Sequence, residues 1–160
     1  MNASINSSSY PQLASSSGFT LIELMVTIAV LAIIVSIAAP NISTQLANQR
    51  VKSTTAILNN ALKEARTESV IRRQPLVLSY DNNSDDSGII EIKTAATINT
   101  YSYDAKSIIK PPQATITFEP SKRVDAAVTY TICDSNSVGS PRQIMVSAVA
   151  NITSQLGGTC

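Results

Sequence analysis

The sequence predicts an α+β fold in which one long N-terminal helix, transmembrane and then amphipathic, packs on an antiparallel β-sheet domain. Three observations predict it. Residues 19–39 are almost entirely apolar. Apolar residues then recur at helical spacing as far as Ala65. After Pro75 apolar and polar residues alternate, which is the period of a half-buried strand.

Composition excludes several functional classes. The chain has 160 residues, the length of one ordinary domain. It contains no His, which excludes His-ligated zinc and nucleophiles that use an imidazole base. The net charge of +1 gives no overall field to attract nucleic acid. We therefore expect no enzyme, no cofactor and no metal.

The apolar segment 19–39 carries one ionisable side chain, Glu23. At about 1.5 Å per residue it spans roughly 30 Å, the thickness of a bilayer's hydrocarbon core. A secretory signal cut before Ala39 is the alternative, since small residues precede that position. The length of the segment and the presence of Glu23 favour a retained membrane helix. An ionisable group there costs about 3 kcal/mol, so Glu23 is a candidate functional residue.

The string GFTLIEL at residues 18–24 resembles the class III signal of type IV pilins and type II secretion pseudopilins. The resemblance implies that a prepilin peptidase cuts between Gly18 and Phe19 and that the new N-terminal Phe19 is methylated. Pro40 falls at the helix-kinking proline of many pilins. One departure is that no Lys or Arg precedes Gly18, so the positive-inside rule gives little support to one orientation.

Glu23 has a physical role in such a design. In a dry helical bundle its carboxylate needs a cation, and the α-amine of a neighbouring subunit's Phe19 supplies one after cleavage. This pairing offsets the desolvation of both charges and fixes the register between subunits, which makes Glu23 the expected assembly contact.

Beyond Pro40 the helix continues as an amphipathic segment to about Arg72. Its expected core stripe comprises Ile42, Leu46, Ile57, Leu58, Ala61, Leu62 and Ala65. Strands are expected at residues 76–80, 90–92, 114–118, 128–132 and 144–148, with a weaker one at 97–103. They predict an antiparallel meander with one face on the helix.

The expected organisation has four parts. Residues 1–18 form a leader that is removed, 19–39 the transmembrane half of the helix, 40–73 its amphipathic half, and 74–160 a periplasmic β-rich domain. Cys133 and Cys160 lie in that domain, where an oxidising compartment favours a disulfide over two free thiols. The bond would contribute about 3–4 kcal/mol in the loop-entropy estimate.

The order of elements is most similar to the GspH/FimT-like minor pilins, so the resemblance implies a pilin-like fold. It further implies a minor type IV pilin at the pilus tip or priming complex that promotes assembly with other minor and major pilins. A type II secretion pseudopilin of the H class is the alternative. Either protein would be a single-pass protein of the bacterial inner membrane with a periplasmic C-terminal domain, and would then enter a pilus or pseudopilus.

The sequence does not favour DNA binding or calcium binding. Some FimT-like pilins bind DNA through a basic C-terminal segment, but the candidates here are only Lys122, Arg123 and Arg142. Two or three phosphate contacts give weak, salt-sensitive affinity. The turn at residues 81–88 is spaced loosely like a calcium loop, yet no bidentate Glu follows, so a solvated turn is preferred.

Overall fold

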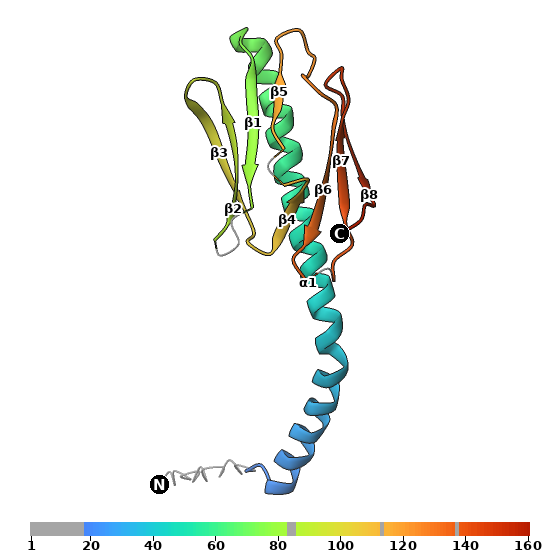
Figure 1. Ribbon diagram of the computed structural model, residues 1–160. Coiled ribbons are helices and arrows are strands. Elements are labelled where there is room, and N and C mark those ends of the chain that lie inside the picture. Colours follow the sequence, from blue (N-terminus) through green and yellow to red (C-terminus); the bar gives the residue numbers. More distant parts are fainter. Residues whose placement is uncertain (1–17, 83–85, 113, 137) are drawn as a thin grey trace, which may run out of the picture. The chain divides into compact units, whose positions relative to one another are not determined.

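The computed structural model describes residues 18–82, 86–112, 114–136 and 138–160, without the side chains of residues 38–41 (Figure 1). Of the expected leader only Gly18 lies within the described residues. Helix α1 (Leu21–Arg72) begins at Leu21 rather than at Phe19 and ends at Arg72 as expected. The chain divides into two compact units, described here separately. The N-terminal unit ends at Ala38, and the C-terminal unit is Ala39–Cys160.

In the C-terminal unit one side of α1 forms a continuous buried stripe. Its members follow the i, i+3, i+4, i+7 spacing that keeps them on one helix face: Ala47, Val51, Thr54, Thr55, Leu58, Ala61, Leu62, Ala65 and Ser69. The expected stripe was wrong at its beginning, because Ile42 and Leu46 are exposed. The helix ends where Arg73 adopts a φ of 54° and Gln74 N donates to Ser69 O at 3.3 Å, a Schellman-type termination.

The strands form two antiparallel four-stranded sheets rather than one meander, so that expectation is corrected. Sheet A has the order β3 (Thr97–Tyr103), β2 (Gly88–Lys93), β1 (Leu76–Asp81), β5 (Ile116–Phe118), and sheet B has the order β4 (Ser107–Lys110), β6 (Val128–Asp134), β7 (Arg142–Val146), β8 (Ile152–Leu156). The chain leaves sheet A after β3, adds β4 to sheet B, and returns for β5. Strand β3 confirms the weaker expectation, whereas β4 and β8 were not expected.

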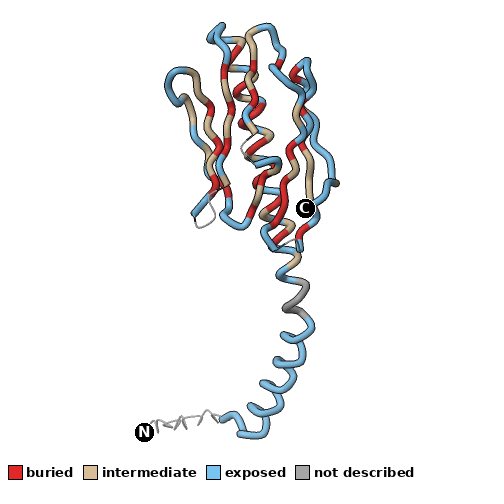
Figure 2. Tube along the Cα trace, viewed as in Figure 1, coloured by how far each residue is buried: buried red, intermediate tan, exposed pale blue. Residues whose placement is uncertain are grey.

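Both sheets turn their apolar faces to the same helix stripe, and one core contains residues of the helix and of both sheets (Figures 1 and 2). Contacts between described residues also join the sheets directly. The rings of Tyr80 on β1 and Tyr130 on β6 meet edge to face with centroids 5.9 Å apart. The side chain of Asn82 donates to Ile109 O at 2.8 Å and accepts from Ile109 N at 2.9 Å, so it extends the backbone pairing from sheet A to β4.

Candidate functional site

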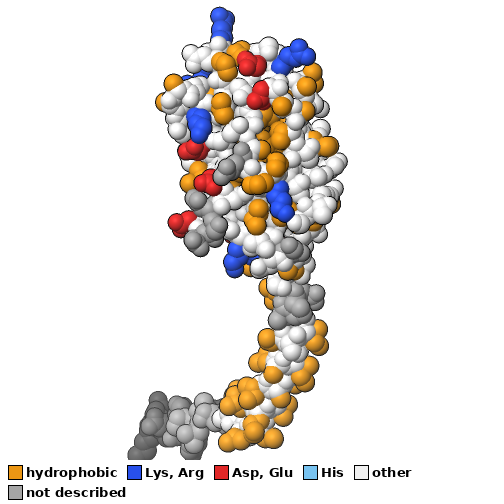
Figure 3. Space-filling view, in the orientation of Figure 1, with side chains coloured by type: hydrophobic (Ala, Val, Ile, Leu, Met, Phe, Trp, Pro, Cys, Tyr) orange, Lys and Arg blue, Asp and Glu red, His pale blue; other side chains and the backbone are white. Residues whose placement is uncertain are grey.

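The N-terminal unit is mostly apolar, and it is exposed wherever its side chains are described. All residues from Gly18 to Ile37 are exposed, including twelve large apolar side chains of the helix and Phe19 (Figures 2 and 3). Among the described residues no single helix meets the length and apolarity needed to cross a membrane, but Leu21–Ile37 and Ile42–Arg72 meet it together. This much exposed apolar surface marks a contact region for lipid or other protein.

Thr20 is the residue that starts α1. Its hydroxyl accepts a hydrogen bond from Glu23 N at 3.2 Å, and its carbonyl accepts from Leu24 N at 3.2 Å. Thr20 is therefore the N-cap, and Glu23 lies in the first turn, where the helix dipole favours a negative charge. Gly18 and Phe19 are left outside the helix, exposed and accessible.

Glu23 is exposed and forms no ion pair with any other residue that the structure describes. The charge of this carboxylate is thus not neutralised within the described chain, which is what an intermolecular contact needs. The sequence pattern Thr-x-x-Glu could have identified the cap, because it is a known helix-start signal.

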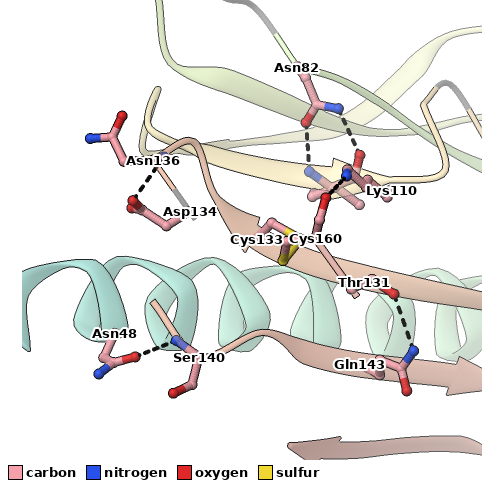
Figure 4. The surroundings of a disulfide bond; sticks show 11 residues. Asn48, Asn82, Lys110, Thr131, Cys133, Asp134, Asn136, Ser140, Gln143 and Cys160 are labelled. Atoms are coloured by element: carbon pink, nitrogen blue, oxygen red, sulfur yellow. Dashed lines mark hydrogen bonds between the residues drawn. A yellow bond between two sulfur atoms is a disulfide. The ribbon is translucent and has the colours of Figure 1, made fainter. Parts of the chain in front are cut away.

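The expected disulfide is confirmed: Cys133 on β6 is bonded to Cys160, with their Cα atoms 5.8 Å apart (Figure 4). Residues 157–160, which we term the C-terminal strap, run from β8 to this bond. Gly157 N donates to Pro141 O at 3.0 Å, and Lys110 Nζ donates to Cys160 O at 2.5 Å. The strap therefore contacts the edge strand β4, the inner strand β6 and the residue that precedes β7 in sheet B.

A buried ion pair fixes the helix to the end of β6. Arg50 Nε and Nη2 both donate to Asp134 Oδ1, at 3.0 and 2.8 Å, and Asp134 Oδ2 accepts from Asn136 N at 3.2 Å. The Asp134 side chain is wholly buried, so Arg50 supplies the charge that makes its burial possible. Close by, Ser140 N donates to Asn48 Oδ1 at 2.7 Å, which ties the β6–β7 loop to the helix (Figure 4).

Comparison with protein families assigns both parts of the chain. Residues 13–39 match the prokaryotic N-terminal methylation motif. Residues 54–150, more than half of the chain, match the type II transport protein GspH. This chain belongs to the GspH family. The family and fold are those of structural pilins rather than of enzymes, and the methylation motif implies a membrane-anchored N-terminal helix.

A solved structure agrees on the fold of this GspH-family chain. A crystal structure of the Pseudomonas aeruginosa type IV minor pilin FimU matches 69% of this chain and 90% of its own, with 20% identity and a TM-score of 0.51. A second crystal form of FimU matches 67% and 92%, with 21% identity and a TM-score of 0.49. No curated protein matches the sequence. The first of the two FimU matches shows the pilin-like fold, as expected from the sequence.

The basic residues considered for DNA binding are not gathered in one place in this GspH-family chain. Lys122, in the turn after β5, lines a groove with Lys63 and Arg66 of α1. Arg142, on β7, lines a separate groove with Lys52. Arg123 is exposed in the same turn as Lys122. Sequence reasoning missed the helix cations, because only the packing of α1 against the turn brings them to Lys122.

Within the described residues, no group of three or more His, Cys, Asp or Glu side chains is arranged to hold a metal ion. Asp85, one of the aspartates of the calcium-like turn, lies outside the described residues.

Proposed function

We propose that this chain is a minor type IV pilin that is cut between Gly18 and Phe19, enters the filament near its tip and promotes assembly. The observation that carries this proposal is the two-part helix. Residues of α1 beyond Ala47 bury one face in a folded unit, whereas Leu21–Ile37 expose apolar side chains throughout their length. Such a segment needs lipid before assembly and other helices after it.

The carboxylate of Glu23 gives the transfer from lipid to filament its specificity. Cleavage after Gly18 would release a positively charged amine on Phe19. In a bundle of helices with little water, the Glu23 carboxylate of one subunit and the Phe19 amine of the next each lose solvation, and each then needs the other. Gly18 is exposed, and the helix begins only at Leu21, so the peptidase would find the bond outside regular structure.

The disulfide supports the orientation that we propose. Bonds of this kind persist in oxidising compartments, and Cys133 and Cys160 both lie in the C-terminal unit. With the N-terminal unit in the inner membrane, the C-terminal unit would fold in the periplasm. Its partners would be other minor and major pilins, after processing by the prepilin peptidase.

Substitution of Glu23 tests the function. Glu23→Ala removes a group that costs about 3 kcal/mol in a membrane helix, so insertion should be unimpaired or slightly improved. The variant should nevertheless accumulate in the membrane and be depleted from sheared pili, because the unpaired amine of its neighbour costs about 3–5 kcal/mol. Quantitative immunoblots of membranes and sheared filaments measure both.

Two further variants sharpen this test. Glu23→Gln keeps the size of the side chain and removes the charge, so it should behave like Glu23→Ala. Glu23→Asp keeps the charge and should retain part of the assembly. Normal entry of Glu23→Ala into filaments would show that the carboxylate is not the assembly contact in this subunit.

A type II secretion pseudopilin is the second candidate function, and the match of residues 54–150 to the type II transport protein GspH favours it. The same fold and the same Glu23 contact would serve a short pseudopilus. Deletion of the gene separates the two. Loss of surface pili with normal secretion supports the minor pilin, and loss of secreted proteins with normal pili supports the pseudopilin.

A further inference from the structure

The C-terminal end of α1 borders a basic groove of about 510 Å³. Three cationic side chains line it: Lys63 and Arg66 from the helix, and Lys122 from the turn after β5. Val70 and Ile71 supply apolar surface beside them, and Ile71 is 68% exposed. In the part of the chain that the structure describes, no carboxylate lines this groove, and none of the three cations forms an ion pair.

The backbone holds Lys122 in a conformation that ordinary residues avoid. Its φ is 61°, in the left-handed region that glycine adopts without strain. The surrounding turn fixes it: Lys122 N donates to Glu119 O at 3.0 Å, and Glu119 N donates to Arg123 O at 2.8 Å. The turn therefore fixes the backbone from which the Lys122 side chain reaches the groove.

The outer face of sheet A carries carboxylates beside an apolar side chain, which complement the cations and apolar residues of the basic groove. Asp81 on β1 lies opposite Ile89 on β2, and Glu91 lies opposite Ser79, so two carboxylates flank an apolar side chain. These residues line a concavity of about 310 Å³, which we term the acidic face. Lys93 also lines it and pairs with Glu91 at 3.2 Å, but both side chains are about two-fifths exposed, so the pair is weak and exchangeable.

We propose that the basic groove of one copy of this chain receives the acidic face of a second copy. Lys63 and Arg66 are three residues apart on one helix face, where Cβ atoms lie about 5–6 Å from each other. Asp81 and Glu91 are diagonal neighbours across two strands, about 7–8 Å apart. Flexible lysine and arginine side chains cover this difference, while Ile89 contacts Ile71.

The two surfaces are different parts of the chain, so the contact is heterologous and joins copies head to tail. This inference rests on the proposed function, because anchoring of the N-terminal helices in one membrane supplies the local concentration of copies that such a small contact needs. A nucleic acid is the less suitable occupant. Its phosphates would satisfy the cations but leave Val70 and Ile71 without apolar partners.

Site-specific photo-crosslinking in the full chain, expressed in its own cells, tests the contact. A photoreactive residue in place of Thr67, which is exposed in the groove, should give a dimer of this chain. Peptide mapping should place the second half of the crosslink within β1 and β2. The double variant Lys63→Glu/Arg66→Glu should lower the dimer yield about tenfold or more, since two attractions become repulsions.

A charge swap supplies the decisive comparison. Asp81→Lys/Glu91→Lys should lower the yield like the groove variant, and the chain with all four substitutions should regain it. Lys52→Glu is the matched control, because it reverses an exposed lysine of the same helix that lines the other groove, and it should leave the yield unchanged.

Three results would overturn the proposal. The first is a crosslink to a different protein or to nucleic acid in place of a dimer, and the second is no crosslink at all. The third is a dimer whose yield does not change with the charge reversals or the charge swap. Filament entry is scored separately in sheared pili. A chain that enters pili without forming the dimer refutes this contact alone, whereas a dimer that never enters pili refutes the proposed function alone.

Discussion

Removing the disulfide should destabilise the C-terminal unit by an amount that the chain length between the cysteines determines. Cys133 and Cys160 are separated by 27 positions. The loop-entropy relation for a closed loop of this size gives about 3.5 kcal/mol of stabilisation at 25 °C. For a folded unit of this size, that corresponds to a decrease of roughly 10–14 °C in the Tm of Cys160→Ser.

The assay is thermal unfolding of the full chain in detergent, followed by circular dichroism. Wild type with reductant should reproduce the decrease, and mass analysis without reductant should find Cys133 alkylated in the variant but neither cysteine alkylated in wild type. Limited proteolysis should cut first near β8, which pairs only with β7 and has mostly exposed side chains. The buried helix stripe should stay protected, because its core partners include β1, β2 and β6.

Two glycines of the strap provide a matched control. Both have positive φ, 135° at Gly157 and 108° at Gly158, so both strain an alanine. Only at Gly158 would a Cβ lie 2.7 Å from Thr131 Cγ2, whereas at Gly157 it meets nothing within 4 Å. Gly158→Ala should therefore slow disulfide formation more than Gly157→Ala. A Tm decrease below about 2 °C on loss of the bond would refute the loop-entropy reasoning.

Three further changes have expected outcomes. Gly18→Ala should leave an unprocessed precursor, which N-terminal sequencing would detect. Its fold and Tm should be unchanged, since a Cβ at this position meets nothing within 4 Å. Asp134→Ala should cost about 3–5 kcal/mol in urea unfolding, because it leaves the Arg50 charge without its buried partner. Gly88→Ala should cost about 1–3 kcal/mol, because its Cβ would lie 2.1 Å from Tyr103 Cζ and displace that ring; Tyr103→Leu in the same background should recover part of the loss.

The periodic spacing of apolar residues in the sequence was sufficient to predict the helix and most of the strands. The helix and strands β1, β2, β6 and β7 each carry apolar residues at their own period over several turns or residues, and all were expected. Strand β4 has only four residues, and β8 has no buried side chain, so neither provides a period to read. Exposed Ile42 and Leu46 show that an apolar residue at helical spacing need not lie on a buried face.

Long-range features could not be predicted in the same way. The division into two sheets depends on which strands pair, and β4 pairs with β6 although β5 intervenes in sequence. The candidate functional residues show the same contrast. The string at residues 18–24 is contiguous, so the sequence alone identifies it. The basic groove requires Lys122 to meet Lys63 and Arg66 across the fold, so the sequence alone does not reveal it. The Arg50–Asp134 pair spans 84 positions and has no sequence signature.

The exposed apolar side chains of Leu21–Ile37 are not needed for folding of the C-terminal unit, so they must meet a different requirement from the buried part of α1. These side chains are exposed, so the folding of the C-terminal unit does not explain why they are apolar. A segment of this composition is stable in lipid, and the same surface is stable against other apolar helices, so moving between the two environments changes its hydrophobic energy little. What changes is the environment of Glu23, because the charge is costly in lipid and can be paired in a filament. In the function that we propose, the carboxylate would therefore set the direction of the transfer, and the apolar residues around it would allow the transfer to occur.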